Sequence, residues 1–147
     1  MNDADLALRR LTYRLLVDLG RAPSLAETAH TAGRTVAETL AGWRRLHDAH
    51  ALVLDPGQSE LRMLNPFAAK PTAFRVSAAG RSWFANCAWD AFGIGAALHV
   101  DSSFDTTCPD CSVPLQVTVT AGRPVPADLL FHVLVPAAQW WTDIGYT

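Results

Sequence analysis

Two capping boxes near the N-terminus constrain the fold of this chain more than any other feature. In each box a hydroxyl residue is followed three positions later by a glutamate: Ser24 with Glu27, and Thr35 with Glu38. Because the two side chains satisfy each other's backbone N–H groups, this spacing marks the first turn of a helix. Gly33 lies between the boxes, where a helix ends in the left-handed conformation. We therefore predict two short consecutive helices.

A longer amphipathic helix is predicted ahead of these two. Asp3 or Asp5 is placed to cap its start, and Gly20 is placed to follow its last turn. Apolar residues recur between them at the spacing of three or four that leaves one face of a helix apolar. These residues are Leu8, Leu11, Leu15 and Leu19.

The third helix is expected to pack against the others and to lead into a β-hairpin. Residues 51–54 and 61–64 are apolar and flank a turn at Asp55-Pro56-Gly57. Three helices followed by a hairpin are the outline of a winged helix, so we assign residues 1–64 to a winged-helix-like (helix-turn-helix) domain. The inward face of the third helix is predicted to hold Val36, Leu40, Trp43 and Leu46.

The outer face of that helix carries Arg44, Arg45 and His47, which could contact phosphates if this domain bound DNA. The charge pattern argues against such a role. Residues 1–81 carry a net charge of +3 and residues 82–147 a net charge of −5, so the electrostatic attraction to DNA is weak. We rank a DNA-binding regulator last among the functions considered and expect no nucleic acid partner.

Residues 65–147 are assigned to a second domain that holds the chemistry, giving an α+β fold with an antiparallel sheet and a mixed α/β core. The hydropathy pattern predicts a strand at 72–76, a buried helix over Arg81–Leu98 and a strand at His99–Thr106. A returning strand turns Leu115, Val117 and Val119 inward; a strand is predicted at Leu129–Val135, and a further element begins over Ala137–Trp141.

Cys87 and Asp90 are the strongest candidates for functional residues. Their spacing of three places the thiol and the carboxyl on the same face of the predicted helix. An acid in an apolar helix is paired, hydrogen-bonded or protonated, and a raised pKa suits a proton donor. The alternative is structural: Cys87 is a small core residue, and Asp90 caps the helix or pairs with an arginine.

Cys108-Pro109-Asp110-Cys111 is predicted to form a tight turn between two strands. A CxxC turn is half of a zinc site and needs two further ligands. The chain offers Cys87 and five histidines for this purpose, none of them in a second paired spacing. A structural zinc ion and a hairpin tip without metal both remain open.

The three cysteines are an odd number, which argues against a disulfide framework and indicates a reducing compartment. No apolar stretch is long enough and free enough of charge to predict a membrane span, and the N-terminus does not read as a secretory signal. We expect a soluble cytoplasmic protein of one compact unit or two small domains that share a core.

The sequence resembles the alkylmercury lyase (organomercurial lyase) family over nearly its whole length. The specific part of the resemblance is Phe74-Arg75-Val76 followed by the segment from Trp83 to Ala91, in which a cysteine and an aspartate lie three residues apart. Cys108 also falls where the family tends to keep a cysteine. The family joins a small N-terminal helix-turn-helix-like domain to an α+β catalytic core.

The resemblance implies cleavage of a carbon–mercury bond by protonolysis, with a hydrocarbon and Hg(II) as products. Cys87 would bind mercury, Asp90 would deliver or relay the proton, and Cys108 would be structural. Soft thiolates suit a soft metal, and sulfur donation makes the bound carbon easier to protonate. The expected partner is a small organomercurial or another thiol-reactive metal compound; Hg(II) stays bound as product, and no cofactor is required.

One departure from the family pattern stands out. The family's second catalytic cysteine lies downstream of the strand that matches Leu129–Val135, but no cysteine follows Cys111 in this sequence. Either the sequence ends short of it, as the abrupt end at Thr147 suggests, or this member lacks it. Cys111 is the one cysteine that could substitute, and on that basis all three cysteines are candidate metal ligands.

Two further alternatives stay open. The protein could bind or sense a metal through its thiols without turnover, or it could be a family scaffold that serves another thiol-dependent reaction.

Overall fold

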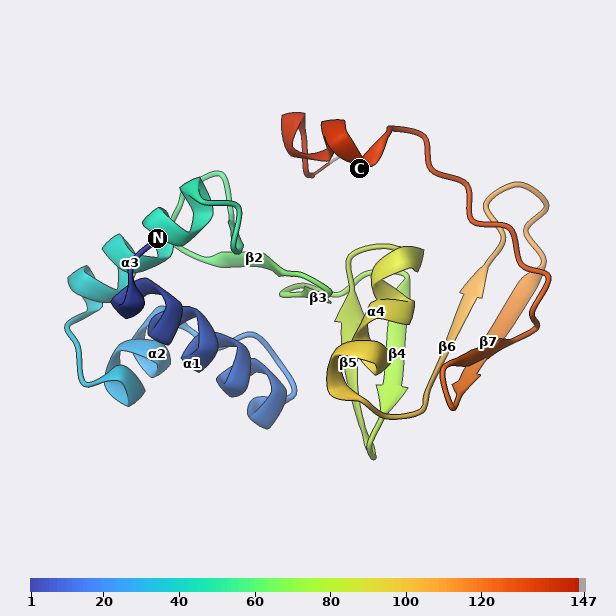
Figure 1. Cartoon of the computed structure of the whole chain (residues 1–147), viewed down its shortest axis with the longest axis horizontal. Helices are drawn as coiled ribbons and strands as arrows, with labels where there is room; N and C mark the ends of the chain where they lie inside the picture. The colour runs from blue at the N-terminus through green and yellow to red at the C-terminus, as the bar shows by residue number, and fades with distance from the viewer. Residues whose placement is uncertain (146–147) are drawn as a thin grey trace.

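A computed structural model describes residues 1–145, so the part of the predicted chain end that falls on Tyr146 and Thr147 lies outside the described residues. Three helices open the chain: α1 (Asp3–Leu19), α2 (Leu25–Ala32) and α3 (Val36–Asp48). They pack together on one side of the molecule, at the left in Figure 1. Gly20 and Gly33 end the first two helices with positive φ angles of 71° and 63°, as predicted.

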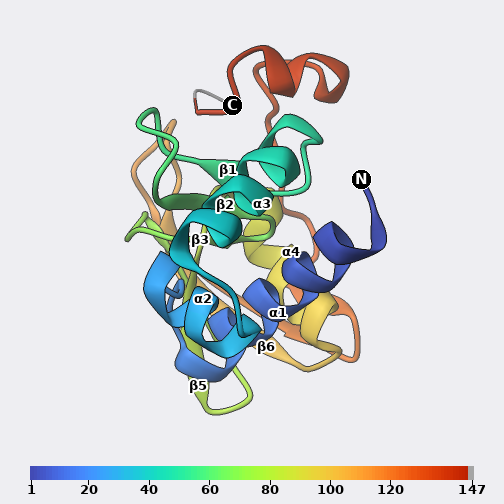
Figure 2. The ribbon, with the colours of Figure 1, turned by 90° about the vertical axis from the view of Figure 1, so that its left-hand side faces the viewer.

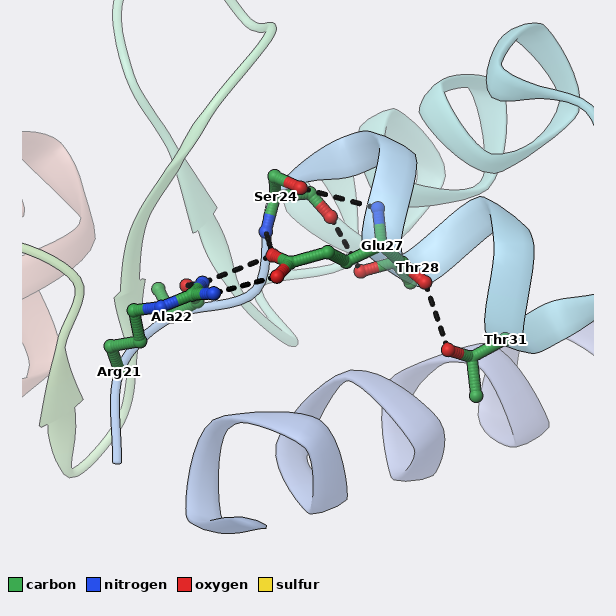
Figure 3. Close-up of polar contacts among 6 residues, drawn as sticks. All are labelled: Arg21, Ala22, Ser24, Glu27, Thr28 and Thr31. Atoms are coloured by element: carbon green, nitrogen blue, oxygen red, sulfur yellow. Dashed lines mark hydrogen bonds and ion pairs between the residues drawn. The ribbon is translucent and has the colours of Figure 1, made fainter. Parts of the chain in front are cut away.

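Both predicted capping boxes are present. Figure 3 shows the first: the Ser24 hydroxyl accepts from the backbone of Glu27, whose carboxylate accepts from the Ser24 N–H at 2.7 Å. The same carboxylate pairs with Arg21, and these contacts hold the loop between α1 and α2 against the start of α2. The second box is built the same way from Thr35 and Glu38.

The predicted cap of α1 is wrong. Asn2, and neither Asp3 nor Asp5, caps the helix by accepting the N–H of Asp5 at 2.9 Å. Asp5 is buried within the first turn, where its carboxylate pairs with Arg45 of α3 at 2.7 Å. A side chain that points into the interface between two helices cannot also reach back to the start of its own helix.

The inward face of α3 is confirmed for two of its four predicted residues. Trp43 and Leu46 are buried and Leu40 is half-buried, but Val36 is 51% exposed. Val36 is the first residue of α3 and precedes the turns that contact α1 and α2. Thr39 and Gly42 take the inward positions instead, and a Cβ on Gly42 would collide with Leu8 of α1.

The eight strands form one antiparallel sheet in the order β1-β2-β3-β5-β4-β6-β7-β8, which confirms the α+β class with N-terminal helices. Figure 1 shows the sheet running from the helices across the molecule. The strands are β1 (Val53–Leu54), β2 (Leu61–Leu64), β3 (Phe67–Ala68), β4 (Phe74–Ala78), β5 (Arg81–Ala85), β6 (Ser102–Thr107), β7 (Pro114–Thr120) and β8 (Arg123–Val125).

The predicted helix over Arg81–Leu98 is wrong in its first third. Residues 81–85 form β5, which pairs with β4 across a turn at Ala79 and Gly80, two residues with positive φ. The aromatic residues Trp83 and Phe84 fit a strand well, and the turn before them brings them back along β4. Only the remainder is helical, as α4 (Ala88–Leu98), which covers β4, β5 and β6 on one face of the sheet (Figures 1 and 2).

The predicted strand at Leu129–Val135 is also wrong. These residues have no regular structure, and Leu130 is 98% exposed. Apolar composition alone cannot form a strand, because the backbone needs a neighbouring strand to bond with. The chain instead runs back over the sheet toward the helices, where the 3-10 helix η1 (Ala137–Thr142) confirms an element beginning at Ala137 (Figure 1). There Trp141 stacks on His50 with ring centroids 4.0 Å apart.

The helices and the sheet share one hydrophobic core. Leu8 and Trp43 from the helices belong to the same buried cluster as Val76 and Ile94 from the sheet and α4. The sheet continues across the predicted boundary at residues 64 and 65, because β2 pairs with β3. No helix in the part of the chain that the structure describes is long and apolar enough to span a membrane.

The contact between α1 and α3 gives a first prediction. The indole N–H of Trp43 donates to the Thr12 hydroxyl at 3.1 Å, and both residues are fully buried. Thr12→Val keeps the volume but leaves that N–H without an acceptor, so we expect the free energy of unfolding to fall by about 1–3 kcal/mol. Urea denaturation measures this loss. The exposed Thr31→Val of α2 is the control, and an equal effect there would contradict the explanation.

Candidate functional site

Cys87 lies at the junction between β5 and α4. It is the N-cap residue of α4, with an extended backbone (φ −151°, ψ −178°), and its side chain is half-buried. The prediction that it lies inside a helix is therefore wrong. Its thiol makes no capping hydrogen bond, but the backbone N–H groups of Trp89 and Asp90, which have no partner within the helix, act to lower its pKa.

Asp90 occupies the third position of α4, so it lies one turn beyond Cys87 in the N3 position of the helix start. An N-cap side chain and the N3 residue are neighbours in the same way as the two partners of a capping box. The predicted proximity of the two residues is therefore found, although it arises from the helix start and not from a shared face in mid-helix.

The Asp90 carboxylate is held by a hydrogen-bond network that reaches α1. Asn86 Nδ2 donates to Asp90 Oδ2 at 2.8 Å and also lies 3.1 Å from Asn65 Oδ1 and 3.4 Å from the Pro66 carbonyl. The hydroxyl of Tyr13 on α1 donates to the Asn65 carbonyl at 3.2 Å. The loop at Asn65 and Pro66 thus joins the N-terminal helices to the candidate site.

Burial raises the pKa of both candidate groups. The pKa of Asp90 is raised by desolvation, and the Asn86 N–H, which favours the ionised carboxylate, only partly offsets this. The pKa of the Cys87 thiol is raised by burial and by the negative charge of Asp90, against the opposing effect of the N–H groups of Asp90 and Trp89. The neighbouring thiol and carboxyl groups therefore both have pKa values above their ordinary ones.

The site is half-open to solvent. Trp89, between the two candidates, is 60% exposed, and its ring lies against Phe131 with centroids 5.9 Å apart. Two hollows of about 610 and 500 Å³ lie elsewhere in the part of the chain that the structure describes. The first is at the opposite edge of the sheet, around Gly80 and Asp101, and the second is between α2 and β2. Neither is lined by Cys87 or Asp90.

Cys108 and Cys111 lie at the tip of the β6–β7 hairpin, as predicted for the CxxC turn. The registers Phe74↔Ala85 and Arg75↔Asp105 show that β5 and β6 run parallel on either side of β4 and finish at the same end of the sheet. Two strand spacings separate the strands by about 10 Å. Among residues 1–145 no group of three or more His, Cys, Asp or Glu side chains could hold a metal ion.

The residues predicted as possible phosphate contacts are engaged within the chain. Arg45 pairs with Asp5, Arg44 Nε donates to the Gln58 carbonyl at 3.3 Å, and His47 Nδ1 accepts the N–H of Leu54. Each of these side chains therefore supports the packing of α3 on α1 or on the hairpin.

Asn86, Asn65 and Tyr13 are the site residues that the sequence analysis missed. A signal existed for Asn86, which lies four positions before Asp90. No signal existed for the other two, because their contacts depend on how the loop and α1 pack.

The fold is α+β, and a cysteine and an aspartate lie together at the start of one of its helices. These two features place the protein in the class whose site combines a thiol with a carboxylic acid. The family model for alkylmercury lyases matches residues 67–147, and the chain therefore belongs to the alkylmercury lyase family. No protein of curated function matches the sequence.

Among solved structures, the chain is similar to "Crystal structure of the mercury-bound form of MerB2", with a TM-score of 0.66 and 21% sequence identity. The match covers 86% of this chain and 62% of that one. This chain thus spans less than two thirds of the length of that relative. At such low identity the likeness supports the fold.

The Asn86 contact leads to a second prediction. Asn86→Leu removes the N–H that favours the ionised form, so we expect the pKa of Asp90 to rise further. The variant should therefore have a lower free energy of unfolding than the wild type, and this difference should grow as the pH rises through the Asp90 pKa. Carbon-13 NMR of the aspartate carboxyls, with the Asp90 signal assigned by its loss in Asp90→Asn, measures the shift. Gln116→Leu, on exposed β7, should leave it unchanged.

Proposed function

We propose that this protein cleaves organomercurials by protonolysis at Cys87 and Asp90. The single observation that carries the proposal is that the two residues are the N-cap and N3 positions of α4, in a chain of the alkylmercury lyase family. The mercury-bound state named for the similar MerB2 structure supports a mercury compound as the ligand.

Cys87 is the proposed mercury ligand. Sulfur is a soft donor that prefers soft, polarisable metals, and the half-buried thiol can be reached from solvent. On binding, the S–H bond breaks, an S–Hg bond forms, and the thiol proton passes to the neighbouring Asp90 carboxylate. The first-turn N–H groups beside the sulfur favour the thiolate that this step requires.

Asp90 is the proposed proton donor. The raised pKa of its carboxyl group favours a protonated acid next to the bound metal. The proton moves from this carboxyl to the carbon atom, the C–Hg bond breaks, and its electron pair forms the new C–H bond. The hydrocarbon leaves, Hg(II) stays on the Cys87 sulfur, and Asp90 returns to the carboxylate form.

A second candidate function is thiol-based metal binding without turnover. It is favoured by the place of the cysteines, since Cys87 is two strands away from Cys108. In an assay of the cleavage reaction, a low-molecular-weight thiol in excess supplies a second sulfur ligand for the mercury bound at Cys87. Because both functions need free thiols, we place the protein in the cytoplasm.

The third prediction tests the lyase. Phenylmercury salt incubated with the protein and excess thiol should release benzene, detected by gas chromatography. Cys87→Ser should abolish benzene release, because the ligand is lost. Phenylmercury retention is measured without added thiol in the Cys108→Ser/Cys111→Ser background, where Cys87→Ser should abolish it. Asp90→Asn should retain phenylmercury but lower benzene release by roughly 10²–10⁴-fold, the usual contribution of a positioned acid.

Asp48→Asn is the matched control, because Asp48 is an exposed aspartate at the end of α3. Its benzene release should equal that of the wild type. Stoichiometric retention of phenylmercury without benzene in the wild type would favour the binding function. Absence of both retention and benzene would remove both candidates.

A further inference from the structure

The turn between β6 and β7 brings two thiols together outside the site described above. It is closed by the terminal strand pair Thr107↔Pro114 and by two backbone hydrogen bonds. The Cys108 N–H donates to the Val113 carbonyl at 2.9 Å, and the Ser112 N–H donates to the Cys108 carbonyl at 2.9 Å. The backbone of Cys108 is thus bonded through both its N–H and its carbonyl, and Cys111 lies within the turn that these bonds close.

The second of these bonds sets the direction of the two side chains. A bond from residue i+4 back to residue i is that of one α-helical turn, in which side chains i and i+3 are neighbours, with Cβ atoms roughly 5–6 Å apart. Cys108 and Cys111 occupy these two positions. Cys111 is exposed and Cys108 half-buried, so a ligand can reach both sulfur atoms.

The turn also favours the thiolate at Cys108. The backbone N–H groups of Cys111 and Asp110 and the thiol of Cys111 lower the pKa of Cys108, against smaller opposing effects from desolvation and from the Asp110 charge. The thiolate is the form of cysteine that binds metals.

We propose that Cys108 and Cys111 form a two-sulfur binding site for a soft cation that accepts two ligands, with the mercuric ion as its occupant. Binding forms two S–Hg bonds, breaks two S–H bonds and releases two protons, and no atom is oxidised or reduced. Zinc does not fit, because a structural zinc ion takes four ligands and residues 1–145 offer no third one here.

The position in the fold favours mercury over other soft cations. Cys87 and the hairpin tip lie at the same end of the sheet with β4 between their strands, so this dithiol is placed to receive a mercuric ion that leaves Cys87. The choice of occupant rests on the proposed function, whereas the existence of the site does not. Mercuric ion added directly therefore tests the site without any cleavage of an organomercurial.

The fourth prediction uses Cys87→Ser, in which the hairpin thiols are the remaining cysteines. Mercuric chloride is added in the presence of excess 2-mercaptoethanol, which displaces mercury held by a single protein thiol. After gel filtration we expect one mercuric ion per monomeric chain, with a thiolate–mercury absorption band in the near ultraviolet. In Cys87→Ser/Cys108→Ser and Cys87→Ser/Cys111→Ser, retention should weaken by roughly 10²–10⁴-fold, because the second sulfur is no longer tethered.

Three results would overturn the site: no retention by Cys87→Ser, equal retention by either single-thiol variant, or mercury found only in dimers that it bridges. Circular dichroism checks that each variant is folded, and the exposed Cys111 is the substitution least able to disturb the core. Mercury retained by Cys87→Ser together with no benzene from the wild type would leave this site standing and remove the proposed lyase.

Discussion

The chain changes from strand to helix within two residues, and the candidate site depends on this change. Ala85, the last residue of β5, is fully buried and is paired with Phe67 on one side and with Phe74 on the other. Its carbonyl also accepts the Thr72 hydroxyl at 2.6 Å. Because the strand is fixed up to this point, Cys87 is held at the start of α4, beside the first-turn N–H groups.

The same junction explains how a carboxylate is kept next to the thiol without a cation. Among residues 1–145, Asp90 has no arginine or lysine as a hydrogen-bond partner, and the neutral amide of Asn86 holds it instead. A cation would lower the pKa of the carboxyl and favour the ionised form, whereas one neutral donor only partly offsets burial. Gly93 packs closely on Pro66 beside this site, since a Cβ added at Gly93 would lie 3.0 Å from the Pro66 Cβ. The α1 helix contributes through Tyr13 and the Asn65 carbonyl.

Local signals predicted the helices better than the sheet. The capping boxes and the glycines at 20 and 33 act within a single turn, so their outcome does not depend on distant residues. The start of α4 was missed because the apolar run through Trp83 and Phe84 suits a buried helix and a buried strand equally well. Residues 81–85 form a strand because they pair with β4 and β3, and no local sequence pattern indicates this pairing. The segment 129–135 failed for the opposite reason: its composition suits a strand, but no neighbouring strand pairs with it.

The candidate site follows the same division. The spacing of Cys87 and Asp90 predicted their proximity, and the CxxC spacing predicted the turn, because in each pair the two residues are only three positions apart along the chain. The sequence could not show that β4 lies between Cys87 and the Cys108–Cys111 pair, because that follows from the strand order.

The pKa values of the thiols are also shifted in opposite directions. Burial raises the pKa of Cys87, whereas backbone N–H groups lower that of Cys108. A thiol with a raised pKa beside an acid is suited to a reaction that consumes a proton. A thiol with a lowered pKa beside a second thiol is suited to holding a metal ion.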